Sequence, residues 1–407
     1  MKTHIRRRSR WRRPWRPWMT DVLALAAALA FFVAALLTPL MARAEPAGSV
    51  IEAANAVMEP GGPDGMTVLV YCRDRRLWRM DFGDIAPDAA LPVASASKWA
   101  AAALVMTAVD DGLMALDAPV GVWLPDASGP GTAASVRQLL SFTAGQGGLS
   151  GGADTRQSTR MTLQESAAQI ARRPLVDPGG STFRYGGPSL QLAGAALENA
   201  TGLSWNEAFR QRLAAPLGLT DARWSGALGR EAGGPVTNPN LQAGLVITAE
   251  DYGRFIAMLA NDGVFAGREV LSPGAVDALM TVQTDGAVMA FRPPGAGSEA
   301  RYNLGSWCEQ AWPDGRCRMA SSPGALGAYP WVDRETGLAG LFFMRHRLPP
   351  VAEDLRRLRA RIVETASCPG GTEMEPVTFR YRLTPPLHPS GAPGGHDDGI
   401  KDKGDIL

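Results

Sequence analysis

Histidine is scarce in this chain, since its 407 residues contain only four. His4 lies in a basic N-terminal segment, and His388 and His396 lie in a C-terminal stretch rich in proline and glycine. Only His346, at the end of an apolar run, belongs to the part expected to fold. A His-rich metal site or a Ser-His-Asp triad would have to rest on His346 alone, which argues against both.

Cysteine is also sparse, and no CxxC motif or Cys/His cluster occurs, so the sequence predicts no zinc site. Cys308 and Cys317 flank "EQAWPDGR", whose Pro-Asp-Gly predicts a turn. A hairpin there would put both cysteines on neighbouring strands. Cys72 and Cys368 come from opposite ends of the domain and can pair only if those ends meet. No metal and no organic cofactor is expected.

The chain has no excess of positive charge outside its N-terminus. The first 44 residues hold nine basic residues and one acid, and the remainder holds 32 basic and 39 acidic residues, a net charge of −7. A chain of that sign offers no broad basic surface. Nucleic acid is therefore not expected as a partner.

The N-terminal 44 residues have the pattern of a secretory signal peptide. An arginine-rich start precedes an apolar run over residues 22–37 and an Ala-Arg-Ala end at residue 44. The segment would engage the membrane during export, which predicts a periplasmic or secreted protein. The alternative is an uncleaved inner-membrane anchor through residues 22–42.

Strand patterns occur at both ends of the domain and helical patterns lie between them. "GMTVLVYCRDRRLWRMDF" predicts two strands joined by a tight turn, and strand patterns return after residue 300. Capping signals recur in the middle of the chain. We expect an α/β (α+β) fold over residues 45–366, with an antiparallel sheet built from both chain ends, flanked by helices, and a helical insertion over about 96–290.

Residues 367–407 are rich in proline, glycine and charge, and are expected to form a disordered tail. Within them, "VTFRYRL" is a candidate edge strand.

One apparent catalytic motif is set aside. "GLSGG", with Ser150 at its centre, matches G-x-S-x-G, but this motif acts only at a turn between an apolar strand and a helix. Here it lies in a glycine-rich polar stretch with no strand before it. A hydrolase that uses Ser150 would also need His346 beside it.

The stretch "VASASKWAAAALVM" offers a different nucleophile. If a helix begins near Ser95, Ser95 and Lys98 share one face, whereas Ser97 points elsewhere. A lysine whose pKa is lowered by an apolar setting can take the proton of a serine hydroxyl. The alternative is that Ser95 caps a helix and Lys98 is solvated, which is the commoner use of so short a motif.

From Ser95 onward the sequence resembles the serine β-lactamase and penicillin-recognising hydrolase superfamily. The similarity is to the branch holding class C β-lactamases, D-amino-acid peptidases, esterases and 6-aminohexanoate oligomer hydrolases. It covers roughly residues 50 to 365, through five segments in the family's order. They are "ASASK", "DDGLMALDAPVGVWLPD" with "VRQLLSFTAG", "FRYGGPSLQLAGAALENATG", "AGLVITAEDYGRFIAMLANDGVFAGREVLSPGAVDALM" and "SPGALGAYPWVDRETGL".

The resemblance implies a role for each matching residue. Ser95 would be the acylated nucleophile and Lys98 the base that activates it. Tyr185 fills the first place of the second motif and would shuttle a proton. The oxyanion hole would consist of the backbone N–H groups of Ser95 and Ala325. The resemblance thus implies an exported serine hydrolase that works through an acyl-enzyme.

Two departures from the family pattern bear on the substrate. Gly187 stands where the second motif usually has asparagine, and the third motif, Lys-Thr-Gly or His-x-Gly in relatives, is Ser322-Pro323-Gly324. Gly324 still permits a close approach to a ligand, and Ser322 would contribute at most a hydroxyl. Without the cation, neutral esters or amides fit better than β-lactams or free-carboxylate peptides such as those of the cell wall.

These departures in the second and third motifs also suggest a different class of function. In that alternative the protein is a catalytically inactive descendant that binds peptidoglycan or another envelope partner. The aromatic residues Trp307, Tyr329 and Trp331 near the third motif would wall a pocket or, equally well for alternating strand positions, lie in the core.

Overall fold

The computed structural model describes residues 46–147, 161–186, 188–230, 234–293, 297, 299–368 and 377–381. The predicted signal peptide, the "GLSGG" motif, Gly187 and most of the C-terminal segment lie outside the described residues. Among the described residues, no helix is long and apolar enough to cross a bilayer.

A sheet of eight strands joins the two ends of the domain, in the order β10-β11-β12-β13-β14-β1-β2-β15. β1 near the N-terminus pairs antiparallel with β14 near the C-terminus, with Met66 opposite Met344. The α/β fold and the antiparallel sheet built from both chain ends are therefore confirmed, although the edge strand β15 runs parallel to β2. The strands are β1 (Gly65–Cys72), β2 (Arg75–Gly83), β10 (Arg301–Tyr302), β11 (Trp307–Ala311), β12 (Cys317–Ser321), β13 (Tyr329–Asp333), β14 (Leu338–Met344) and β15 (Val377–Tyr381).

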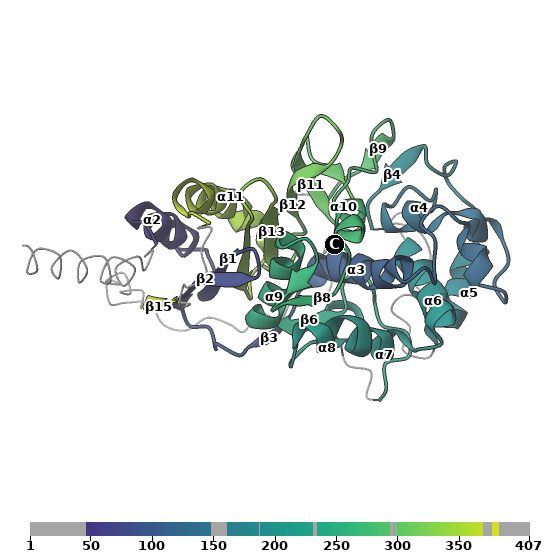
Figure 1. Ribbon diagram of the computed structural model, residues 1–407, viewed down its shortest axis with the longest axis horizontal. Coiled ribbons are helices and arrows are strands. Elements are labelled where there is room, and N and C mark those ends of the chain that lie inside the picture. Colours follow the sequence, from purple (N-terminus) through teal and green to yellow (C-terminus); the bar gives the residue numbers. More distant parts are fainter. Residues whose placement is uncertain are drawn as a thin grey trace, which may run out of the picture. The chain divides into compact units, whose positions relative to one another are not determined.

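Helices cover both faces of this sheet. Consecutive β1 side chains point to opposite faces, and the apolar ones on each face pack against a different set of helices. Val68 and Val70 pack with α2 (Gly48–Val57) and α11 (Leu348–Thr365), which lie side by side in Figure 1. Leu69 and Tyr71 instead join a larger core that includes α3 (Ser97–Asp110), α6 (Ser189–Thr201) and α9 (Ala249–Ala260). Both faces of β1 are thus buried, in agreement with its sequence, in which only Thr67 interrupts the apolar run.

The middle of the chain is mainly helical, as expected. Serine and threonine side chains start five of these helices by accepting a backbone N–H three residues on. The capping residues are Ser135, Thr162, Ser204, Thr248 and Ser272. The helices are α3 (Ser97–Asp110), α4 (Val136–Leu140), α5 (Leu163–Ala171), α6 (Ser189–Thr201), α7 (Trp205–Phe209), α8 (Ala215–Leu217), α9 (Ala249–Ala260) and α10 (Pro273–Leu279).

Short strands also lie between these helices. β3 (Ala90–Pro92), β6 (Leu245–Thr248) and β5 (Arg223–Trp224) form a small sheet. β4 (Thr182–Arg184) pairs with β9 (Val288–Phe291), and β7 (Val264–Phe265) with β8 (Arg268–Glu269). The first two of these sheets matter for the site, because β3 leads into the Ser95 segment and β4 ends next to Tyr185.

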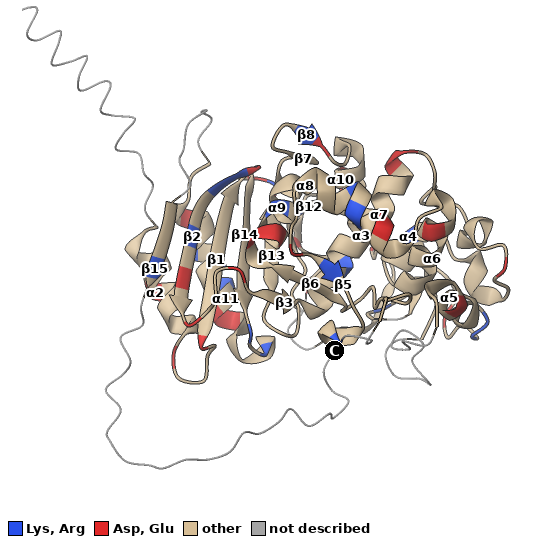
Figure 2. Cartoon of the chain, turned by 90° about the horizontal axis from the view of Figure 1, so that it is seen from below, with Lys and Arg blue, Asp and Glu red and all other residues tan. Residues whose placement is uncertain are grey.

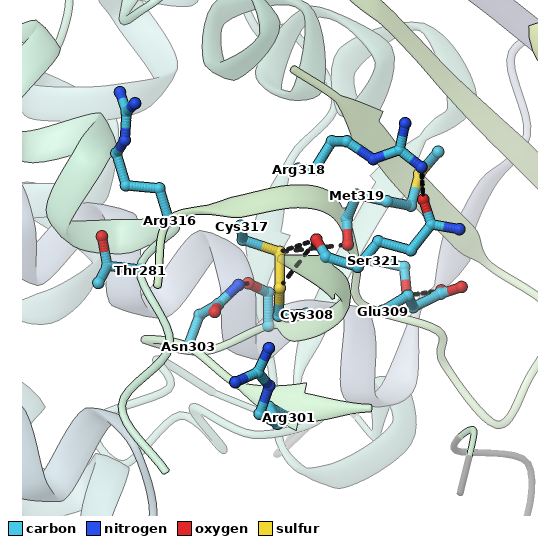
Figure 3. The surroundings of a disulfide bond; sticks show 12 residues. Thr281, Arg301, Asn303, Cys308, Glu309, Arg316, Cys317, Arg318, Met319 and Ser321 are labelled. Carbon is cyan, nitrogen blue, oxygen red and sulfur yellow. Dashed lines mark hydrogen bonds between the residues drawn. A yellow bond between two sulfur atoms is a disulfide. The ribbon is translucent and has the colours of Figure 1, made fainter. Parts of the chain in front are cut away.

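Two disulfides tie the sheet. Cys308 on β11 is bonded to Cys317 on β12, so the Pro-Asp-Gly turn does form a hairpin (Figure 3). Cys368, just after α11, is bonded to Cys72 at the end of β1. The C-terminal segment beyond residue 366 is therefore not wholly without structure: it includes this bridge and β15, the candidate edge strand of the sequence.

Charged residues of both signs are interspersed along the helices and strands in the view of Figure 2. Many of them form ion pairs with a charge of opposite sign, for example Arg137 with Asp117 and Arg359 with Glu309.

Candidate active site

The Ser95 segment is a tight turn rather than the start of an α-helix. A single 3-10 turn spans Ala94–Ala96, and α3 begins at Ser97. Ala94 has φ of 46°, a conformation that costs energy for a residue with a side chain. The hydroxyl of Tyr252 on α9 donates to the Ala96 carbonyl at 2.7 Å and helps to hold the turn. The Ser95 side chain caps no helix, so the capping alternative is wrong.

Lys98 is buried and lies against Ser95. Its Nζ donates to Ser95 Oγ at 3.0 Å and to the carbonyl of Gln242 at 3.1 Å. The lysine is only 1% exposed because α3 is surrounded by core on all sides. The alternative of a solvated lysine is therefore wrong as well. Ser97 points elsewhere, as expected, since its Oγ accepts from the Leu245 N–H.

Tyr185 completes this group of side chains. Its ring centroid lies 4.7 Å from Lys98 Nζ, and its hydroxyl lies near the side chains of Ser95 and Trp307. Burial raises the pKa of Tyr185 to about 12, against the opposing effect of those two side chains. At neutral pH Tyr185 is therefore a phenol that can donate a proton.

The position of Tyr185 follows from β4 and an aromatic cluster. Its backbone N–H donates to Phe291 on β9, which extends the β4–β9 pairing by one residue. Its ring stacks on Trp307 with centroids 5.2 Å apart. Phe183 and Tyr302 pack around both rings. Phe142 also contacts the Tyr185 ring, with centroids 5.5 Å apart, so four aromatic neighbours restrict the orientation of the phenol.

The third-motif segment follows β12 and passes directly over the Ser95 turn. A Cβ at position 324 would lie 2.0 Å from the Val93 carbonyl oxygen, so only glycine fits there. The hydroxyl of Ser322 lies 3.4 Å from the Ser95 carbonyl oxygen and 3.5 Å from that of Gly305. It is therefore directed at the main chain.

The two backbone groups expected to form an oxyanion hole are both unengaged. Within the described part of the chain, neither the Ser95 N–H nor the Ala325 N–H has a hydrogen-bond partner. The Gly324 carbonyl, which shares a peptide with the Ala325 N–H, accepts from the Gly327 N–H at 3.0 Å, and this bond helps to fix that peptide. Gly324 brings the Ala325 segment against the Ser95 turn.

Tyr329 and Trp331 lie in the core that faces α2 and α11, not in the core that contains Tyr185. The pocket-wall interpretation is therefore wrong for these two, and Trp307 alone of the three contacts Tyr185.

His346 follows β14, and its backbone N–H donates to the Leu326 carbonyl at 3.2 Å. Ser150 lies outside the described residues, so the hypothesis of a Ser150–His346 pair remains a prediction from the sequence. No group of three or more His, Cys, Asp or Glu side chains in the described ranges could hold a metal ion.

Two contacts of the site were not predicted from the sequence: the Gln242 carbonyl with Lys98, and Trp307 with Tyr185. One signal could have sharpened the choice of Lys98: it is the only lysine between Lys2 and Lys401.

Comparisons with known proteins find similarity in sequence and in fold. A family model described as Beta-lactamase matches residues 50–364. Protein Rv1367c of Mycobacterium tuberculosis is 26% identical over 328 residues, 68% of this chain and 82% of that protein. Esterase EstB of Burkholderia gladioli is 33% identical over 153 residues, 33% of this chain and 38% of the esterase. A solved structure from Bacteroides dorei, provisionally named a beta-lactamase, has a TM-score of 0.65 at 29% identity and covers 76% of this chain and 97% of its own.

Proposed function

Because the chain belongs to the beta-lactamase family, we propose that it is a serine hydrolase that cleaves a neutral ester or amide through an acyl-enzyme on Ser95. One observation carries the proposal: a buried lysine lies 3.0 Å from the hydroxyl of a serine in a strained turn. A non-catalytic binder would not need to keep an amine buried at that distance, because burying an amine is costly.

In the acylation step, the neutral amine of Lys98 takes the proton of Ser95 Oγ, and Oγ bonds to the acyl carbon. The carbonyl oxygen becomes an oxyanion, which accepts hydrogen bonds from the N–H groups of Ser95 and Ala325. The bond to the leaving alcohol or amine then breaks. Tyr185 donates its proton to the leaving group and regains one from Lys98.

In the deacylation step, water gives a proton to the Lys98–Tyr185 pair and attacks the acyl carbon. The Ser95 ester breaks, Oγ is reprotonated and the free acid leaves. The net reaction is ester or amide plus water to acid plus alcohol or amine. No redox change occurs and no further co-reactant is needed.

Preference for a neutral substrate rests on the third motif. Ser322 replaces the cation of relatives, and its hydroxyl lies near two main-chain carbonyls. A substrate carboxylate would therefore find no charge at this position. The similarity to an esterase over 153 residues agrees with an ester as substrate.

The test is intact mass after exposure to a fluorophosphonate, a short p-nitrophenyl ester and a penicillin. We expect a fluorophosphonate adduct and ester turnover in the wild type and in Ser97→Ala, and neither in Ser95→Ala. Ser97 is the matched control because it is buried, adjacent and hydrogen-bonded only to the backbone among the contacts described. A lasting penicillin adduct would contradict the neutral-substrate argument. No adduct with any probe would favour the envelope-binding alternative.

We further propose that the protein is exported, to the periplasm or beyond the cell. The proposal is supported by the N-terminal pattern and by the two disulfides, which favour an oxidising compartment. The measurement is the N-terminal mass of the protein made from its full gene in a Gram-negative host. Loss of residues 1–44 would support a cleaved signal, and an intact N-terminus in the membrane fraction would support the anchor.

A further inference from the structure

Lys98 has one contact that controls how its amine is oriented. A neutral amine has two N–H groups and one lone pair, and only the lone pair can take the proton of Ser95. An N–H donated to the Gln242 carbonyl at 3.1 Å limits rotation of the amine. The lone pair can then be directed at Ser95 Oγ, 3.0 Å away. The position of the Gln242 carbonyl therefore bears on catalysis.

That carbonyl belongs to a tight turn held by both the backbone and the side chain of Asn240. The Asn240 main-chain carbonyl accepts from the N–H groups of Ala243 at 3.3 Å and Gly244 at 2.7 Å. Asn240 Oδ1 accepts from the backbone N–H of Gln242 at 3.0 Å and from that of Ala243 at 2.9 Å. An asparagine that bonds to N–H groups two and three residues on closes a turn and sets its peptide planes. Asn240 is 4% exposed, so water does not readily replace it. The orientation of the Gln242 peptide thus depends on the Asn240 amide.

A second buried amide fixes the start of the same turn. Gln191 on α6 is fully buried, and its Nε2 donates to Asn238 Oδ1 and to the Pro239 carbonyl, both at 3.0 Å. Its Oε1 accepts from the Leu241 N–H at 3.0 Å. Gln191 therefore joins the segment to α6 through three hydrogen bonds that a side chain of any other type could not make together.

We propose that Asn240 and Gln191 are positioning residues for the base. Their amides hold the turn of residues 238–243 so that the Gln242 carbonyl orients Lys98 toward Ser95. The inference rests on the proposed role of Lys98. The hydrogen bonds described for the two amides go to the turn itself, and neither position is distinguished by charge or by a motif.

The first test is the pH dependence of ester hydrolysis. A displaced Gln242 carbonyl stabilises the ammonium form of Lys98 less, so Asn240→Ala should move the acid limb of the pH–rate profile to lower pH. In the same variant kcat should fall about 100-fold, which is the usual cost of a displacement of about 1 Å at a reacting group. Asn240→Asp keeps both acceptor bonds and adds a negative charge, which should restore orientation and move the acid limb to higher pH. Gln191→Met should resemble Asn240→Ala. KM should change little in all three.

The control is Asn261→Ala, which removes an amide hydrogen bond to the Val264 carbonyl at the end of α9. It should lower Tm comparably without moving the acid limb. If Asn240→Ala and Gln191→Met lose activity only in proportion to their unfolded fraction, with the limb unmoved, the proposal is wrong.

A readout independent of activity separates this inference from the proposed function. The full chain has four lysines, so [6-13C]lysine labelling gives four signals, and Lys98→Arg identifies that of Lys98. Tyr185 is the titratable group that the described contacts place against this amine. The Lys98 midpoint should fall in Asn240→Ala and rise in Asn240→Asp. An unchanged midpoint in both would overturn the proposal even if the enzyme is active, and shifted midpoints would sustain it even if no ester is cleaved.

Discussion

Gly324 gives the most quantitative test of how the third-motif segment contributes to catalysis. An added Cβ would lie 2.0 Å from the Val93 carbonyl oxygen and 3.3 Å from the Ala96 nitrogen. Contacts below 3.0 Å to a backbone oxygen do not occur, so the Gly324 segment and the Ser95 turn must separate by at least about 1 Å in Gly324→Ala. That separation moves the Ala325 N–H away from the position where the oxyanion forms.

A shift of about 1 Å at a reacting group costs about 100-fold in rate. At about 1.36 kcal/mol for each tenfold change in rate, this equals about 2.7 kcal/mol of transition-state stabilisation. It is close to the loss of one oxyanion-hole donor, which is about 2.7–4 kcal/mol. Overpacking should also lower the free energy of unfolding by about 1–3 kcal/mol.

The assay is kcat and KM on a p-nitrophenyl ester, with Tm measured in parallel. The matched control is Gly274→Ala on α10, where an added Cβ would lie 3.7 Å from Ser272 Oγ. It should leave kcat unchanged and stabilise the protein by about 0.4–1 kcal/mol. If Gly324→Ala lowers Tm but keeps kcat within about threefold, the Ala325 N–H does not contribute to the oxyanion hole as argued.

Three further changes test other parts of the molecule. Lys98→Arg should lose at least about 100-fold in kcat on the same ester, because a guanidinium cannot act as a base; retained turnover would exclude a base at this position. Burial alone would raise the pKa of Glu309, but hydrogen bonds and charge from Arg359 hold it below its usual value. The ionised Glu309 therefore stabilises the folded state fully at neutral pH, and this contribution is lost as the pH falls through the lowered pKa. Glu309→Gln should therefore flatten the acid side of a plot of Tm against pH, and an unchanged slope would contradict the assignment. The double change Cys72→Ser and Cys368→Ser removes a disulfide that closes a loop over a sequence separation of 296. It should lower the free energy of unfolding, measured by urea titration, by about 2–5 kcal/mol. Equal stability of the variant and the wild type would mean that the bridge does not constrain the unfolded chain.

The strands and helices were predictable where local chemistry decides them. The "GMTVLVYC" run is apolar without alternation because both faces of β1 are covered, and Thr162 and Thr248 cap helices through contacts three residues away. The parallel pairing of β15 was not predictable from its sequence, since it depends on where the Cys72–Cys368 bridge and α11 bring the chain back. Tertiary placement also decided that Tyr329 and Trp331 face α11, because either face of β13 would accept aromatic residues.

The candidate site was predictable only where one motif contains both partners. Ser95 and Lys98 are three residues apart, so any helical turn brings them close together. Gln242, by contrast, contacts Lys98 across 144 residues through its backbone carbonyl, a group that every residue type has. Trp307 was considered only as a pocket wall or a core residue, because its contact with Tyr185 requires β4 and β11 to be neighbours in space.

The choice of basic residue in this chain argues for chemistry at Lys98. Ion pairs among the described residues, such as Arg76 with Glu250 and Arg359 with Glu309, use arginine, and Lys98 is the only lysine between Lys2 and Lys401. Arginine makes the better ion pair, with five donors in a planar fork, but it does not release its proton in proteins. A chain that otherwise uses arginine gains nothing structural from a buried primary amine that contacts a hydroxyl, a carbonyl and a phenol ring. What the amine alone can do at that position is lose its proton and accept that of Ser95, which is the step that an acyl-enzyme requires.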